Sequence, residues 1–390
     1  MTPGDAGAAA MIPVIRPWLG EEEAAAAAET VRSGWVAQGP RVAEFETAFA
    51  AAAGAAHGVA VSSCTTALHL AMHLLGVGPG QEVVVPSFSF IATANAVHYA
   101  GATPVFADVD EATGNITPDT VEAALSPRTA AVIGVHQGGV PFDVASVAAL
   151  CRRRHLPLVQ DAACAAGASY RGRPVAAEAS LAAWSFHPRK LLTTGEGGML
   201  TCEDPRWAAR LRRLREHGMS VSAAERHSSG SVALESYDEV GFNFRMTDVQ
   251  AAIGLVQLAK LPEVIARRRE LAQRYHKLLA EVDELCGLRA VTDPEHGTTN
   301  YQSFWVVLPP DYPGTVVEVL AGLRERGISA RRGIMAAHLE PAYAGTARTP
   351  LPVTEHLTTR SLILPLFHQL TDGEQDRVVA GLTELLRRRR

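Results

Sequence analysis

Short apolar runs alternate with helical periodicity over the first two thirds of the chain. Runs rich in valine and other apolar residues predict buried strands at residues 57–63, 82–86, 103–109, 131–136 and 156–160. Between them, apolar residues spaced three to four positions apart predict helices at residues 21–33, 41–53, 64–70 and 144–154. This alternation predicts an α/β fold with a mostly parallel sheet covered by helices on both faces.

The pattern changes towards the C-terminus. Two helices are predicted at residues 249–258 and 262–282, with Thr247 as a candidate N-cap. Beyond them, strands near residues 302–308 and 328–332 alternate with helices at 315–326 and 373–387. This second pattern predicts a smaller α+β domain. We therefore divide the chain into a large domain, 1–255, which includes an N-terminal arm, and a small domain, 256–390.

Composition excludes several classes of function. The formal net charge of −5 gives no reason to expect nucleic acid or an anionic membrane as a partner. No apolar run reaches the roughly 18 residues that a membrane span needs, and the first residues do not resemble a signal peptide. The five cysteines are scattered without a C-x-x-C pair, which argues against disulfides and against a zinc site. A reducing, cytoplasmic location is the simplest expectation.

The candidate chemistry centres on residues 183–200, AWSFHPRKLLTTGEGGML. They place Lys190 between an apolar run ending at Phe186 and a glycine-rich turn that leads into another strand. Burial in apolar surroundings would lower the pKa of a lysine, and a neutral amine is a nucleophile for carbonyl groups. The segment alone fits a Schiff-base lysine or an ordinary surface lysine in a loop.

Two further features fall at the carboxyl ends of predicted strands, where parallel sheets bind ligands. Asp161 ends one strand, and Thr65 and Thr66 open a helix directly after another. A helix N-terminus with hydroxyl groups suits a phosphate, although the same residues also serve as ordinary N-caps. Together with Ser185, these positions suit pyridoxal phosphate: Lys190 for its aldehyde, Asp161 for its protonated ring nitrogen, and the hydroxyl groups for its phosphate.

Six ordered motifs carry a resemblance to a known family: SGWVAQGPRVAEFE, SSCTTALHLAM, PSFSFIATANAV, QDAACAAGA, SFHPRKLLTTGEGG and GFNFRMTDVQAAIGLVQL. The chain resembles the DegT/DnrJ/EryC1/StrS sugar aminotransferases, a group of fold-type I pyridoxal phosphate enzymes, from about Ile12 to Leu382. The resemblance implies the fold-type I architecture, and because the motifs keep their order along the chain, it carries more weight than any one of them.

The resemblance also assigns roles to single residues. Lys190 matches the Schiff-base lysine, which also moves the substrate proton, and Asp161 matches the partner of the ring nitrogen. Phosphate ligands are implied at Thr65, Thr66 and Ser185. The other implied positions are Phe90 stacked on the ring, Asn243 reaching the phosphate of the neighbouring subunit in a homodimer, and Trp35 and His338 near the substrate.

Cys164 departs from the family pattern, because many members have Gln or His there, near the phenolic oxygen of the cofactor. Cys64 stands where many members have Gly or Asn. Lys190 separates the chain from dehydratase relatives, which carry His at this position. Whether Cys164 keeps a contact with the cofactor is left open by the sequence.

The resemblance implies transfer of an amine from glutamate or glutamine to a nucleotide-linked keto sugar, such as a dTDP-4-keto-6-deoxyhexose. A 3-keto sugar or a keto-cyclitol acceptor, a sugar 3-dehydratase and a cofactor-binding regulator without turnover remain alternatives. No metal is expected.

Overall fold

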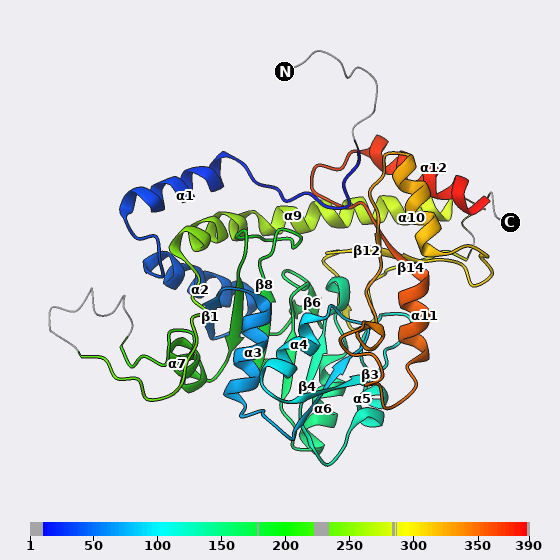
Figure 1. The fold of residues 1–390 in the computed structure, drawn as a ribbon. Helices are drawn as coiled ribbons and strands as arrows, with labels where there is room; N and C mark the ends of the chain where they lie inside the picture. Colours follow the sequence, from blue (N-terminus) through cyan, green and yellow to red (C-terminus); the bar gives the residue numbers. More distant parts are fainter. Residues whose placement is uncertain (1–10, 178, 222–233, 283–284, 286, 388–390) are drawn as a thin grey trace.

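The computed structural model describes residues 11–387, apart from residues 178, 222–233, 283–284 and 286. A sheet of seven strands forms its centre, in the order β1-β9-β8-β5-β4-β2-β3 (Figure 1). The strands are β1 His57–Val61, β2 Glu82–Pro86, β3 Thr103–Ala107, β4 Thr129–Val135, β5 Leu158–Asp161, β8 Leu181–Ser185 and β9 Gly198–Cys202. All are parallel except β9, which runs antiparallel to its neighbours β1 and β8. The mostly parallel α/β fold is therefore confirmed.

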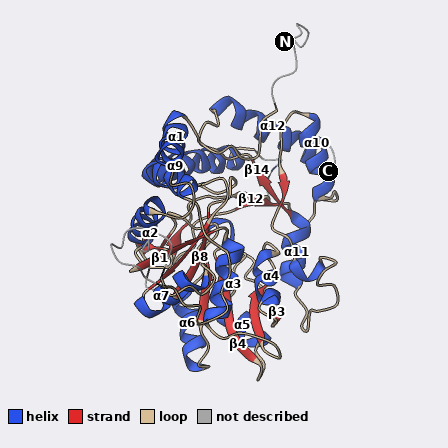
Figure 2. Ribbon diagram, turned by 60° about the vertical axis from the view of Figure 1, so that its left-hand side comes forward, coloured by secondary structure: helices blue, strands red, loops and turns tan. Residues whose placement is uncertain are grey.

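Helices cover both faces of the sheet (Figure 2). The N-terminal and large-domain helices are α1 Glu21–Ser33, α2 Pro40–Ala53, α3 Cys64–Leu74, α4 Ala92–Tyr99, α5 Pro118–Ala124, α6 Val144–Arg153 and α7 Pro205–Leu214. Alternation along β8 shows how the faces are filled. Leu181 and Ala183 pack with residues of α3, α4 and α7, whereas Ala182 and Trp184 pack with residues of α2 and of α9 Asp248–Ala280.

The C-terminal part builds a four-stranded antiparallel sheet, β10-β12-β14-β13. Its elements are β10 Arg289–Ala290, β12 Phe304–Val307, α10 Val316–Glu325, β13 Arg331–Arg332, α11 Pro352–Arg360, β14 Ser361–Leu364 and α12 Asp372–Arg387. A small three-stranded sheet joins β11 Gly297–Thr298 to β6 Ser169–Tyr170 and β7 Arg173–Pro174. The predicted strands and helices of this region are present, and the sequence analysis missed β14 and α11.

One helix replaces the two that were predicted around Pro262. α9 runs without a break from Asp248 to Ala280 and contains Pro262 in its interior. A proline there removes one hydrogen bond of the helix. Leu261 and Val264 are buried on either side of it, and α9 packs along α1 and α2 (Figure 1). This packing outweighs the local penalty.

The predicted division at residues 255 and 256 therefore falls inside α9. One hydrophobic cluster includes residues of the large sheet, such as Val84 and Val132, together with residues of the small sheet, such as Phe304 and Leu362. The N-terminal arm also crosses over: the Ile12 amide donates to the Gly327 carbonyl at 2.8 Å. The arm thus pairs with the C-terminal part of the chain, and the two parts share a continuous core.

By length and composition, α9 also qualifies as a membrane span, with a mean hydropathy of 1.3 over an 18-residue window. In the apolar first half of the helix, Ala251, Leu261 and Val264 are buried against other parts of the chain. A core helix of a globular protein has the same composition, and the packing of α9 accounts for its apolar character.

The N-termini of α2 and α9 are held together by one buried carboxylate. Gly39 at the N-cap of α2 has no side chain to cap the helix, and the fully buried Asp248 takes that role. It accepts from the backbone N–H groups of Gly39 at 2.8 Å, Val42 at 3.0 Å and Arg41 at 3.1 Å. A Cβ atom at residue 39 would lie 2.8 Å from the carboxylate, so the contact requires glycine there.

We expect Asp248→Ala to lower the free energy of unfolding by about 3 kcal/mol or more, because it leaves three N–H donors of α2 without their acceptor. Urea unfolding followed by circular dichroism measures the change. Asp248→Asn keeps one carbonyl acceptor and should fall between the wild type and the alanine variant. Equal midpoints for all three proteins would contradict this role of Asp248.

Candidate active site

The carboxyl ends of three strands meet at one edge of the large sheet. Asp161 is the last residue of β5 and Ser185 is the last residue of β8, which pairs with β5 in parallel. β1 has the same direction as β8, because both run antiparallel to β9. α3 follows β1 and begins at this edge. The topology thus gathers the groups that the sequence analysis singled out.

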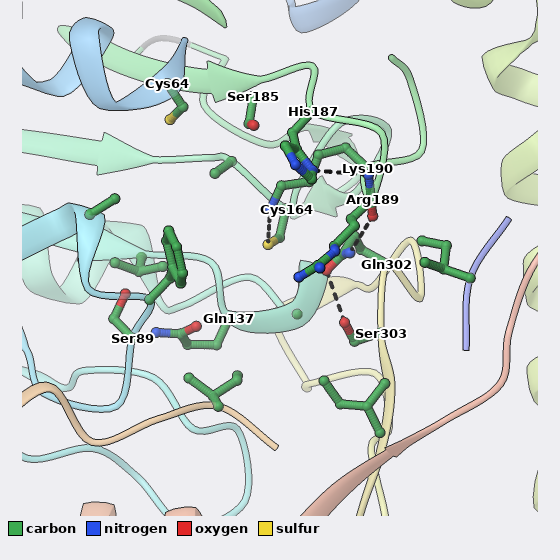
Figure 3. Close-up of a pocket in the computed structure, with 18 of the residues that line it drawn as sticks. Cys64, Ser89, Gln137, Cys164, Ser185, His187, Arg189, Lys190, Gln302 and Ser303 are labelled. Atoms are coloured by element: carbon green, nitrogen blue, oxygen red, sulfur yellow. Dashed lines mark hydrogen bonds between the residues drawn. The ribbon is translucent and has the colours of Figure 1, made fainter. Parts of the chain in front are cut away.

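A cavity of about 380 Å³ opens at this edge (Figure 3). The large domain contributes the ends of β5 and β8, the start of α3 and the segment that leads into α4. The small domain contributes residues around β12, β13 and β14. Of the expected site residues, the cavity is lined by Thr65, Phe90, Asp161, Cys164, Ser185 and Lys190.

Lys190 lies in the turn between β8 and β9. The turn is closed by the Phe186 amide, which donates to the Gly197 carbonyl at 2.9 Å, and by the Lys190 amide, which donates to the His187 carbonyl at 2.8 Å. The Lys190 ammonium lies 3.1 Å from the Cys164 sulfur. These contacts direct a single amine towards the loop after β5.

The sequence analysis expected burial to lower the pKa of Lys190. In the structure, neighbouring groups change this result. Burial does lower the pKa, but Cys164, Cys64 and the Asp161 carboxylate raise it by more. The pKa of Lys190 therefore lies above the ordinary lysine value. The sequence analysis considered only the apolar strand before the lysine, whereas the fold brings a carboxylate and two thiols from other segments.

Asp161 is 5% exposed and has few compensating contacts. It accepts a hydrogen bond from the Thr93 hydroxyl at 2.9 Å and one from the Ala163 amide at 3.1 Å. Burial raises the pKa of this carboxyl; the Ala163 and Thr93 hydrogen bonds and the charge of Lys190 lower it only in part. An ionised Asp161 would therefore be stabilised by a cationic group in the cavity.

Thr65 and Thr66, at the N-terminus of α3, differ in their contacts. Ser63 caps the helix by accepting from the Thr66 amide at 3.1 Å, and the Thr66 hydroxyl donates back to the Ser63 carbonyl at 2.8 Å. Thr66 is not among the residues that line the cavity, and its expected contact with the phosphate stays a prediction. Thr65 does line the cavity, as does Ser185. A Cβ at Gly198 would lie 2.4 Å from the Ser63 carbonyl carbon, which shows how closely β9 approaches this turn.

Phe90 and Cys164 line the cavity from two different segments of the chain. Phe90 is 65% exposed although it is large and apolar, and it precedes α4. Cys164 belongs to the loop after β5. The Asn300 side chain holds this loop by donating to the carbonyls of Cys164 at 2.9 Å and Ala166 at 2.8 Å. Asn300 is 1% exposed and comes from the C-terminal part of the chain, so both domains fix the position of Cys164.

Besides Thr66, three more expected site residues are not in the cavity lining of this chain. Trp35 is 38% exposed in the loop before α2, and Asn243 is exposed and forms a β-bridge with Glu216. His338 is 6% exposed: its Nδ1 lies 2.6 Å from the Ser87 hydroxyl and its Nε2 lies 3.3 Å from a Glu355 oxygen. His338 thus joins the segment after β2 to α11, and it is not among the residues that line the cavity. Its expected place near the substrate stays a prediction.

The sequence analysis also missed several lining residues. Thr93 lies within a quoted motif, but nothing in the sequence says that its hydroxyl meets Asp161. Gln302, Ser303 and Arg331 come from the small domain and reach the cavity only through the tertiary fold. No local pattern marks these three residues.

Comparison with known proteins now gives the family. Residues 17–383 match the model of the DegT/DnrJ/EryC1/StrS aminotransferase family. The chain belongs to this family. That assignment confirms the resemblance stated from the sequence motifs, and it covers nearly the whole chain.

Solved structures of similar proteins agree with the assignment. The aminotransferase TlmJ of Streptoalloteichus hindustanus is 40% identical and has a TM-score of 0.88, covering 97% of this chain and 99% of that one. DesV of S. venezuelae is 34% identical with a TM-score of 0.86 and the same coverage of both chains. Spr1654 of Streptococcus pneumoniae, a proposed sugar aminotransferase, is 25% identical in its PLP form with a TM-score of 0.88, again covering 97% of this chain and 99% of that one. The fold-type I architecture, the aminotransferase class and the cofactor pyridoxal phosphate are thereby confirmed.

The residues of the cavity fit this cofactor. A buried carboxylate with few hydrogen bonds suits a protonated ring nitrogen, and Lys190 offers an amine in the same cavity. Thr65 and Ser185 offer hydroxyl groups beside the N-terminus of an eleven-residue helix, which suits a phosphate. The donor set therefore matches the three functional parts of the cofactor.

We expect Thr93→Val to shift the acidic limb of the pH–kcat/KM profile to higher pH. Loss of the Thr93 hydroxyl removes a hydrogen bond that lowers the pKa of Asp161, so protonation of the carboxylate begins at a higher pH as the pH falls. Activity should be lost at mildly acidic pH and retained better at neutral pH. Thr93→Ser keeps the hydroxyl and should keep the wild-type profile, whereas an unchanged limb in Thr93→Val would contradict this role.

Proposed function

We propose that the protein transfers an amine from glutamate or glutamine to a keto sugar linked to a nucleoside diphosphate. The favoured acceptor is a dTDP-4-keto-6-deoxyhexose, which would become a 4-amino sugar. The observation that carries the proposal is that Lys190 and Asp161, at the ends of neighbouring strands, border one cavity of about 380 Å³. One of the similar proteins, PseC of Helicobacter pylori, is an aminotransferase involved in the biosynthesis of pseudoaminic acid.

In this proposal Lys190 and Asp161 carry the chemistry. Bound pyridoxal phosphate supplies an aldehyde that condenses with amines and a ring that accepts electron density. Lys190 would hold the cofactor through its amine and would move the proton at the substrate carbon. Asp161 would face the protonated ring nitrogen as a carboxylate. Its hydrogen bonds from Thr93 and Ala163 fix the direction of the carboxylate.

Other residues would hold the cofactor in place. Thr65, Ser185 and the backbone N–H groups at the start of α3 would bind the phosphate, with Thr66 fixing the turn through its own cap bonds. Phe90 would cover one side of the ring. Cys164, which lies beside Lys190, would take the position near the phenolic oxygen.

The cavity also favours amination over the alternatives. Sugar 3-dehydratase relatives carry His in place of the lysine, whereas Lys190 would provide the side-chain amine that holds the cofactor and moves the proton in transamination. A regulator without turnover would not require a lysine beside a buried carboxylate. A 3-keto sugar or a keto-cyclitol remains the second candidate acceptor, because either would present the same carbonyl group to Lys190.

We further propose a homodimer in which each active site receives residues from both subunits. Asn243 lies outside the cavity of its own chain and is exposed, and Trp35 is partly exposed as well. The exposed fractions of Phe90, Tyr237 and Val240 are 65%, 58% and 84%, so apolar surface is available for a second copy. Asn243 would then reach the phosphate of the partner's cofactor.

A cytoplasmic location completes the proposal. Cys64, Cys151, Cys164 and Cys202 are all free thiols, and the two at the cavity would be exposed to oxidation in an oxidising compartment. The division into domains at residues 255 and 256 also remains our working description, with α9 as the shared element.

We expect Lys190→Ala to abolish both the visible absorbance of the bound cofactor and amine transfer, because no other amine occupies its place in the cavity lining. Purified protein is incubated with labelled glutamate and a panel of nucleotide-linked keto sugars, and the products are followed by mass spectrometry. Lys277→Ala, at a lysine whose side chain is 76% exposed, serves as the matched control. Dehydration without label transfer by the wild type would overturn the proposal.

The shared active site predicts complementation. Asn243→Asp places a carboxylate against the partner's phosphate and should abolish activity, as should Lys190→Ala. After the two inactive proteins are mixed and their subunits exchanged, each mixed dimer contains one site with both native residues. Activity should recover to roughly a quarter of the wild-type value if subunits pair at random. No recovery, with exchange shown by native mass spectrometry, would contradict the role of Asn243.

A further inference from the structure

Three exposed arginines and one histidine lie in the lining of the cavity. His187 and Arg189 follow β8 in the large domain, whereas Arg331 and Arg332 form β13 in the small domain. All four line the cavity. Figure 3 shows His187, Arg189 and Gln302 on one side of it.

The backbone around Arg189 is well fixed. Its amide donates to His187 Nδ1 at 3.1 Å, and the Gln302 side-chain amide donates to its carbonyl at 3.0 Å. Gln302 belongs to the segment before β12, so the small domain holds Arg189 in position. The guanidinium itself extends to an exposed position at the mouth.

Two of these four side chains have an acidic partner and two do not. Arg332 pairs with Glu340 at 3.0 Å, and His187 lies 3.9 Å from Glu196. Within the part of the chain that the structure describes, neither the Arg189 nor the Arg331 side chain has an ion pair or a hydrogen bond.

The charge of Arg331 is affected by two neighbouring arginines. Burial lowers the pKa of Arg331, and the neighbouring charges of Arg189 and Arg332 lower it further. Arg331 in turn contributes to a lowered pKa at His187, after burial of that ring and alongside Arg189 and Lys190. Repulsion among these guanidinium groups costs free energy, and an anion bound in the cavity that they line would recover it.

We propose that Arg331 and Arg189 form a subsite for the diphosphate of the nucleotide-linked acceptor, with one guanidinium from each domain. The inference rests on the proposed function, because it assigns a place to one part of that acceptor. A diphosphate carries more than one negative charge, which matches two unpaired guanidinium groups, and the planar fork of arginine suits phosphate oxygens. The keto group then points inward to Lys190 while the charged linkage stays at the mouth.

The carboxylates of the amino donor are also anions and could bind to the same two arginines. The two sources separate in experiment, since the donor reacts in one half of the cycle and the acceptor in the other. A diphosphate subsite acts on nucleotide binding alone, whereas a carboxylate subsite acts on the donor half-reaction.

The test is calorimetric titration of the cofactor-loaded protein with dTDP and, in parallel, UDP, without any turnover. Arg331→Gln should weaken binding of both nucleotides roughly tenfold or more, the size expected for one charge-assisted contact to phosphate. Arg331→Lys keeps the charge and should retain most of the affinity. Arg324→Gln removes an exposed charge on α10 outside the cavity and should leave binding unchanged. Unchanged cofactor absorbance shows that the variants are folded.

The donor half-reaction is followed in the same proteins as the change in cofactor absorbance on adding glutamate. We expect its KM to stay the same in Arg331→Gln. Equal nucleotide affinity in wild type and Arg331→Gln overturns the subsite, as does a raised glutamate KM with nucleotide binding unaltered. If no keto sugar is aminated but Arg331→Gln still loses nucleotide binding, the proposed reaction fails and the subsite stands.

Discussion

The candidate active site depends on the burial of one carboxyl group, Asp161, which is unfavourable for its charged form. Asp161 ends a central strand at 5% exposure; the Thr93 hydroxyl and the Ala163 amide donate to it, and the Cys64 sulfur lies 4.0 Å from its Oδ1. Burial raises the pKa of the carboxyl, which means that the folded chain alone holds it in a poorly compensated state. A cationic ring nitrogen would relieve that state. In that arrangement the cofactor would contribute to the stability of the site as well as to its reactivity.

The rest of the fold fixes the position of this carboxylate relative to Lys190. β5 and β8 are neighbouring parallel strands, so the residues that follow them leave the sheet at the same edge. The loop carrying Cys164 is held by Asn300 from the C-terminal part, and α2 and α9 are joined by the buried Asp248. These contacts come from segments far apart in the sequence. They fix the site between two domains whose hydrophobic core is continuous.

The sequence predicted what depends on local pattern. Strand ends, helix periodicity and the motif around Lys190 predicted the α/β architecture and picked out Lys190 and Asp161, which line one cavity. The break at Pro262 was predicted wrongly, because the packing of Leu261 and Val264 is not visible in a local window. The prediction of a lowered pKa for Lys190 was wrong for the same reason. The groups that raise this pKa, chiefly Cys164, lie near Lys190 only in the folded chain. Small-domain residues in the cavity lining could not be identified from the sequence for that reason as well.

The charges in the cavity also suggest how one site could serve two different substrates. The inner end presents a carboxylate, an amine and hydroxyl groups, which suit the cofactor and the reacting carbon that both substrates share. The mouth presents His187, Arg189 and Arg331, of which the last comes from the small domain. The chemistry is therefore built on the rigid edge of the sheet, whereas recognition of the remainder of each substrate falls to loops and to β13. Selectivity for the acceptor can then change through residues at the mouth without disturbing Lys190 or Asp161.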